Sequence, residues 1–122
     1  MNPLSALVPM AFVDSVPRSI EFYERLGFVV GNTFVPPDQT EPSWAWLKSG
    51  GAQLMVARAS EPIVPSQQAI LFYLYCEDVA QFRAELNNAD VVVGEITYPF
   101  YAPGGEFRVT DPDGYALMVT HT

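Results

Sequence analysis

The chain carries an internal repeat, and a repeat constrains the fold strongly because each copy is expected to form the same structural unit. Gly51 and Leu54–Val56 recur as Gly114 and Leu117–Val119, with matching residues 63 positions apart. The same offset places Phe12 on Tyr75, Asp14 on Glu77, Val16 on Val79 and Trp44 on Phe107. We therefore expect two copies of one unit.

The first copy is predicted to contain a strand, a helix and three further strands. An apolar strand over 7–13 precedes a helix that Ser15 caps, that has Pro17 in its first turn and that Gly27 ends. The remaining elements are a strand over 28–35, a proline-rich loop over 36–43 and a hairpin over 44–48 and 53–58.

The second copy follows a connector over 59–68 that has two prolines and no periodicity. Asp78 and Gln81 are spaced as a capping box before a second helix. The expected strands cover 69–76, 91–98, 106–110 and 115–120, with a loop over 99–105 and an Asp-Pro-Asp-Gly turn in the last hairpin.

These elements predict an α+β fold with two βαβββ modules related by the internal repeat. We expect a single domain over 1–122, in which module 1 covers about 5–58, the connector 59–68 and module 2 about 69–121. Each module has one helix to cover one face of its sheet. The other face must be covered by the opposite module, a partner subunit or a ligand.

The charge of the chain restricts its partners. Fourteen acidic and six basic residues give a net charge of −8, which disfavours nucleic acid and anionic membranes and favours a cationic ligand. No basic opening indicates a signal peptide, and no apolar run approaches the ~20 residues of a membrane span. Cys76 is the only cysteine, so no internal disulfide forms. We expect a cytoplasmic protein.

Three segments resemble a known family. VDSVPRSIEFYERLGF at 13–28, CEDVAQFRAEL at 76–86 and GEFRVTDPDGYALMV at 105–119 are similar to the vicinal oxygen chelate superfamily of glyoxalases, bleomycin resistance proteins and extradiol dioxygenases. The resemblance implies paired βαβββ modules whose curved mixed sheets enclose a cavity. It also implies that the enzymes hold a metal at four equivalent positions, which here are Val8, Met55, Leu71 and Met118.

None of these four side chains is a suitable ligand for a hard or borderline divalent ion, which needs oxygen or imidazole donors. The only histidine, His121, lies next to the C-terminus. We therefore expect no metal, no other cofactor and no catalytic residue. The alternative is a metal-dependent glyoxalase-like lyase, isomerase or dioxygenase whose metal site lies elsewhere. A third hypothesis is a regulatory subunit that binds a metabolite or a protein.

Strand alternation predicts an apolar, aromatic lining around the four marker positions. Trp44 and Trp46 share one strand face, and two registers remain open for them. If the Asp-Pro-Asp-Gly tip is a type I turn with a glycine bulge, Phe107 and Val109 pair with Leu117 and Val119 toward the helices, both tryptophans are core, and Arg108 enters the cavity.

The resemblance to the bleomycin resistance branch then implies a homodimeric, metal-independent protein that binds a small molecule. This ligand could be a bulky cationic or aromatic antibiotic that the protein sequesters. Aromatics near the 99–105 loop are expected at the cavity rim or in a dimer contact. The candidate ligand-binding residues are Met10, Phe12, Phe34, Trp44, Trp46, Met55, Tyr73, Tyr75, Tyr98, Phe100, Tyr101, Arg108 and Met118.

Overall fold

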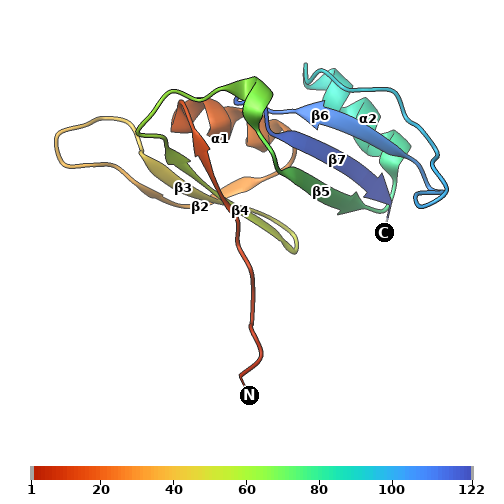
Figure 1. The fold of residues 1–122 in the computed structure, drawn as a ribbon, viewed down its shortest axis with the longest axis horizontal. Helices are drawn as coiled ribbons and strands as arrows, with labels where there is room; N and C mark the ends of the chain where they lie inside the picture. The colour runs from red at the N-terminus through yellow and green to blue at the C-terminus, as the bar shows by residue number, and fades with distance from the viewer. Residues whose placement is uncertain (1, 122) are drawn as a thin grey trace. The chain divides into compact units, whose positions relative to one another are not determined.

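The computed structural model describes residues 2–121, which fall into two compact units, one ending at Ile63 and the next beginning at Val64. Each unit contains one α-helix and one mixed sheet (Figure 1). This arrangement confirms the predicted α+β fold. No helix within the described part of the chain is long and apolar enough to cross a membrane.

The first unit is a four-stranded sheet with the order β1-β4-β3-β2, in which only β1 and β4 are parallel. Its helix α1 packs on β2, β3 and β4. The elements are β1 (Met10–Val13), α1 (Val16–Arg25), β2 (Val29–Phe34), β3 (Trp44–Ser49) and β4 (Ala52–Arg58).

The second unit is a three-stranded sheet with the order β5-β7-β6, in which β5 and β7 are parallel. Its helix α2 packs on β6 and β7. The elements are η1, a 3-10 turn over Pro65–Gln67, then β5 (Leu71–Cys76), α2 (Val79–Asn88), β6 (Glu106–Thr110) and β7 (Ala116–His121).

Both helices begin at the predicted caps. The Ser15 hydroxyl accepts a hydrogen bond from the Arg18 backbone N–H at 3.2 Å, and the Asp78 carboxylate accepts one from the Gln81 N–H at 2.9 Å. The Gln81 side-chain amide donates to Glu85 at 3.2 Å, so it is directed along the helix and away from the reciprocal bond of a capping box.

The strand predicted over 91–98 is wrong. Its pairing with β6 consists of an isolated bridge between Thr97 and Glu106 and a bond from the Gly94 N–H to the Arg108 carbonyl at 2.9 Å. Gly94 and Thr97 are three residues apart, whereas their partners on β6, Arg108 and Glu106, are two apart. The one extra residue interrupts the regular hydrogen-bond pattern of a strand pair. The second sheet therefore has three strands where four were expected.

Smaller corrections concern the predicted starts of two strands and the connector. The strand predicted over 7–13 begins only at Met10, and the strand predicted over 69–76 begins at Leu71. Pro9 has no N–H to donate to a ladder, although its carbonyl accepts from the Met55 N–H at 2.9 Å. The connector, expected to contain no element, includes the turn Pro65–Gln67.

The offset of 63 does not hold on β3 and β6. Val56 pairs with Ala45, whereas its repeat partner Val119 pairs with Phe107, so the two paired residues are 62 positions apart. The chain between the paired residues Phe107 and Val119 is one residue longer than the chain between the equivalent pair Ala45 and Val56, which explains the shift. The predicted match of Trp44 with Phe107 is therefore wrong.

The glycine-bulge register is confirmed for the second hairpin. Phe107 and Val109 pair with Val119 and Leu117, and all four side chains are buried. Gly114 takes a positive φ of 88° in the turn, and the Asp111 carboxylate accepts N–H bonds from Asp113 and Tyr115 at 2.9 and 2.8 Å.

The expected consequence of that register for the tryptophans is wrong. Ala45 and Leu47 are the buried residues of β3 that lie on the same side as Leu54 and Val56. Trp44 and Trp46 alternate with them, so they lie on the side of the sheet away from α1 and are partly buried there. Their structural equivalents in the second unit are Glu106 and Arg108.

Candidate functional site

The side of the first sheet opposite α1 is lined by large apolar side chains, and we call it the first open face. Strand pairing arranges them in two rows, because side chains of paired residues lie on the same face. One row is Met10, Met55, Trp46 and Asn32, and the other is Phe12, Ala57, Trp44 and Phe34. The ends of these rows are exposed, since Met10, Phe12 and Phe34 are all accessible to solvent.

Trp46 is held in place by two polar neighbours on this face. Its indole N–H donates to the Gln53 side-chain oxygen at 3.0 Å. The Lys48 ammonium lies 5.0 Å from the centroid of the Trp46 ring, within range of a cation–π interaction. The orientation of the indole is thus fixed before any ligand arrives, which lowers the entropy lost on binding.

The corresponding side of the second sheet, the second open face, combines aromatic and charged side chains. One row is Tyr73, Met118 and Arg108, and the other is Tyr75, Thr120 and Glu106. The rings of Tyr73 and Tyr75 stack with centroids 6.2 Å apart and an interplanar angle of 28°. Both tyrosines and Arg108 are exposed, whereas Thr120 and Glu106 are buried.

The segment before β6 brings three further aromatics to this unit. Tyr98, Phe100 and Tyr101 are exposed, and the Phe100 and Tyr101 rings meet edge to face with centroids 5.4 Å apart. The Tyr101 hydroxyl donates to Glu106 Oε1 at 2.9 Å. This hydrogen bond raises the pKa of Tyr101 above its usual value because it stabilises the protonated phenol.

The four positions that the sequence analysis assigned to the family's metal site have side chains that do not fit a divalent ion. Met55 lies on the first open face beside β1, the parallel strand that Val8 precedes. Met118 lies on the second open face beside β5, the parallel strand that begins with Leu71. Aliphatic groups and thioethers provide no donor for hard or borderline ions. Among residues 2–121, no three His, Cys, Asp or Glu side chains are grouped so that they could hold a metal.

Cys76 is the free cysteine of the second unit, and its surroundings do not activate the thiol. Cys76 pairs with His121 at the ends of β5 and β7. Partial burial raises the pKa of the Cys76 thiol, so less of the reactive thiolate is present at neutral pH. The exposed His121 lies in the last described position of β7.

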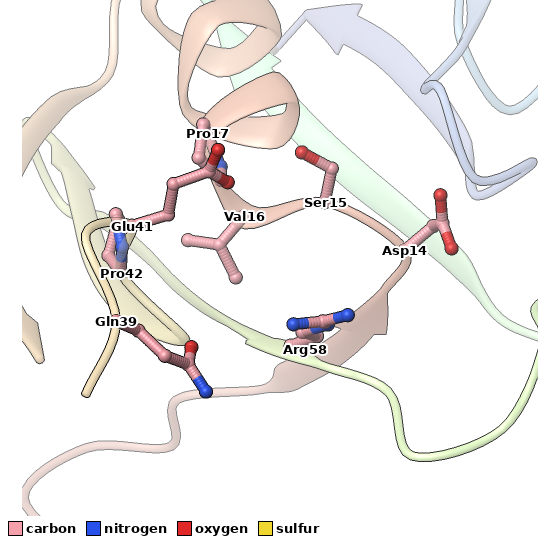
Figure 2. A pocket seen from close by; sticks show the side chains of 8 residues that line it. All are labelled: Asp14, Ser15, Val16, Pro17, Gln39, Glu41, Pro42 and Arg58. Carbon is pink, nitrogen blue, oxygen red and sulfur yellow. The ribbon is translucent and has the colours of Figure 1, made fainter. Parts of the chain in front are cut away.

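A small pocket lies apart from the predicted site residues, at the start of α1. Its volume is about 150 Å³. Figure 2 shows loop residues Gln39, Glu41 and Pro42 on one side of it and Asp14 on the other, with Arg58 between them. The other lining residues are Ser15, Val16 and Pro17. The lining combines charged and polar side chains with one valine and two prolines, and the sequence analysis did not predict it.

The structure places every predicted ligand-binding residue in one of three groups. Met10, Phe12, Phe34, Trp44, Trp46 and Met55 share the first open face. Tyr73, Tyr75, Arg108 and Met118 share the second open face, and Tyr98, Phe100 and Tyr101 precede β6. The sequence analysis missed Glu106. An offset of 62 between β3 and β6, in place of 63, would have matched Glu106 with Trp44 and placed it on an open face.

A family model and several solved structures are similar to this chain. The model described as Glyoxalase/Bleomycin resistance protein/Dioxygenase superfamily matches residues 6–119. A bleomycin resistance determinant encoded on the transposon Tn5 has 19% identity and a TM-score of 0.79, with 98% of each chain covered. No curated protein matches.

Two Streptomyces proteins have similar structures. A bleomycin-binding protein from bleomycin-producing Streptomyces verticillus, complexed with copper(II)-bleomycin, has 19% identity and a TM-score of 0.74, covering 100% of this chain and 99% of the other. TnmS3, an antibiotic-binding protein from a Streptomyces species, has 18% identity and a TM-score of 0.75, covering 99% and 98%. At these identities the likeness establishes the fold.

Proposed function

Because this chain belongs to the glyoxalase/bleomycin resistance protein/dioxygenase superfamily, we propose that it binds a small organic molecule without a metal ion and without transforming it. The observation that carries this proposal is the first open face, where exposed Met10, Phe12 and Phe34 border the partly buried Trp44 and Trp46. The positions of this chain that the sequence analysis assigned to the metal site of the enzymes are Val8, Met55, Leu71 and Met118. These side chains have no oxygen or imidazole donor for a divalent ion.

The first open face suits a flat, apolar ligand. Burial of apolar surface contributes about 25 cal/mol per Å², so a ligand that covers one phenylalanine side chain gains roughly 1.5–3 kcal/mol. Aromatic stacking on fixed rings adds about 0.5–1.5 kcal/mol per pair. The Trp46 indole, held by Gln53 and Lys48, is a suitable platform for such stacking.

The specific form of the proposal is sequestration of a bulky cationic or aromatic antibiotic. Solved proteins of this fold include ones that bind bleomycin and another antibiotic-binding protein. The net charge of −8 favours the approach of a cation and opposes binding to nucleic acid or anionic membranes.

We also propose that the protein is a cytoplasmic homodimer. Exposed apolar side chains on both open faces favour cover by a partner or ligand, because large apolar patches are costly in water. The single free thiol of Cys76 is compatible with a reducing compartment. Analytical ultracentrifugation should give twice the chain mass, and a monomer at micromolar concentration would refute the dimer.

Isothermal titration calorimetry with metal-free bleomycin tests the antibiotic proposal. Saturable heat is expected, and Phe12→Ala should weaken binding by about tenfold because it removes an exposed ring of the first open face. Val92→Ala is the matched control, since it truncates an exposed apolar side chain outside both open faces. Absence of heat at high micromolar protein would remove the antibiotic from the proposal.

Elemental analysis of the purified protein separates the binding protein from a metal-dependent enzyme of the same superfamily. We expect fewer than ~0.1 divalent ions per chain, because the four marker positions lack donors. A stoichiometric divalent ion would overturn the metal-free proposal.

A further inference from the structure

Glu106 is a buried carboxylate with unused hydrogen-bonding capacity. The residue is 4% exposed, its Oε1 accepts the Tyr101 hydroxyl at 2.9 Å, and its buried Oε2 has no hydrogen-bond partner among the described residues. Leaving a buried charged oxygen unpaired is costly, so such groups are usually paired or have a role in binding.

The position of Glu106 on β6 directs it to the second open face. Phe107 and Val109 are buried on the side of α2, whereas Arg108 is exposed on the opposite side. Alternation therefore places Glu106 on the same face as Arg108. Across the sheet, Glu106 pairs with Thr120, and Thr120 pairs with Tyr75.

The fold itself does not require a carboxylate at this position. Glu106 is the structural equivalent of Trp44, which the first unit places on its own open face. The same architecture thus forms with an apolar aromatic ring at one copy of the position and an acidic group at the other. The repeated unit therefore does not need the Glu106 carboxylate in order to fold, and the carboxylate is a feature of the second open face alone.

No basic side chain within residues 2–121 forms an ion pair with Glu106. Arg83, on α2, instead contacts Glu95 at 3.7 Å and donates to the Gly94 carbonyl at 2.7 Å. Arg108 shares the face with Glu106 but makes no ion pair with it in this structure. The carboxylate is therefore not neutralised by an ion pair with a described basic side chain.

We propose that Glu106 anchors a cationic N–H group of the ligand, either a protonated amine, an amidine or a guanidine, with Tyr101 as the residue that positions the carboxylate. The Tyr101 hydroxyl fixes Oε1 and leaves Oε2 for a charge-assisted hydrogen bond. This inference rests on the proposed binding of a small molecule to the open faces.

The surroundings of Glu106 suit a cation attached to an aromatic group. Tyr75 lies two strands away in the same row, at roughly 10 Å from the spacing of neighbouring strands, and it is 64% exposed. Its ring can stack on the aromatic part of the ligand while the cation contacts Glu106. Tyr101, whose hydroxyl donates to the carboxylate, is 60% exposed, so its ring can also contact the ligand.

The experiment compares benzamidine, which is a cation, with benzamide, which is neutral and of similar shape, by NMR titration of the full chain. We expect benzamidine to bind roughly tenfold to a hundredfold more tightly, as hydrogen bonds to charged groups contribute. In Glu106→Gln this preference should disappear, while benzamide affinity stays within about twofold of the original value. The glutamine oxygen can still accept the Tyr101 hydroxyl, so the local packing is retained.

Glu95→Gln is the matched control, because it removes the same charge from an almost fully exposed side chain of the same unit. It should leave the preference for benzamidine unchanged. Equal loss in both variants would overturn the proposal in favour of general acidic attraction, as would a preference that persists in Glu106→Gln. Equal binding of the two probes to the original protein would refute the Glu106 site alone, whereas binding of neither would refute both proposals.

Discussion

Phe107 and Arg108 are neighbours on β6, and they provide a direct test of the register that defines the open faces. Phe107 is 1% exposed on the side of α2, and Arg108 is exposed on the opposite side. Phe107→Ala removes a fully buried ring and should cost about 3–5 kcal/mol of unfolding free energy. Arg108→Ala should change that free energy by no more than about 0.5 kcal/mol, since exposed substitutions rarely do more.

Urea denaturation measures this difference. With a slope of about 1.5 kcal/mol per molar urea, a loss of 3 kcal/mol lowers the unfolding midpoint by about 2 M. The Phe107→Ala midpoint should fall by at least that amount, and the Arg108→Ala midpoint by less than about 0.5 M. Similar losses in both variants, or the larger loss in Arg108→Ala, would refute the assignment of Arg108 to an open face.

Three further predictions concern the turn, the Tyr101 phenol and metal dependence. Gly114→Ala should lower the melting temperature, because Gly114 has a φ of 88° and a new Cβ would collide with Pro65; Gly51→Ala, where a Cβ meets nothing within 4 Å, should not. The hydrogen bond to Glu106 raises the pKa of Tyr101. The stability that this hydrogen bond contributes is therefore complete below the usual tyrosine pKa and is lost as the pH rises through the raised pKa. Absorbance titration should therefore show one late tyrosine that titrates earlier in Glu106→Gln, and an unchanged titration would contradict the bond. Incubation with EDTA should leave the unfolding midpoint unchanged, and a drop would indicate a bound structural metal.

The helices were predictable from the sequence because their signals are local. Ser15, Asp78 and Gly27 act through the backbone groups of their own turns, and these groups behave in the protein as in a short peptide. The missing strand at 91–98 depends on a non-local effect. Its residues favour a strand, but the spacing of Gly94 and Thr97 against β6 interrupts the ladder.

The grouping of candidate residues on the open faces was largely predictable, because alternation along a strand needs only one correct reference residue. Met55 and Met118 provided that reference for β4 and β7. The offset of 63 was wrong between β3 and β6, where one extra residue between paired positions makes Glu106 and Arg108 the equivalents of Trp44 and Trp46. Glu106 was missed for the same reason, and its contact with Tyr101 depends on loop packing that periodicity does not describe.

The two copies differ mainly on their open faces, and this contrast bears on how a binding function is built. On the helix side, the equivalent residues Leu47 and Val109, like Leu54 and Leu117, are apolar and buried in both units. On the open side, Trp44 and Trp46 are replaced by Glu106 and Arg108.

Core positions are restricted in both units because a polar group there would be buried without a partner. Open-face positions differ between the units: the first presents the Trp44 and Trp46 rings, and the second presents Arg108 and the buried carboxylate of Glu106. A flat apolar ligand would use the aromatic surface of the first unit, and a cationic ligand would use the carboxylate of the second. Glu106→Gln should therefore weaken the binding of cationic ligands, and Phe12→Ala the binding of flat apolar ligands. Equal losses for charged and neutral ligands in both variants would show that the two faces do not divide recognition in this way.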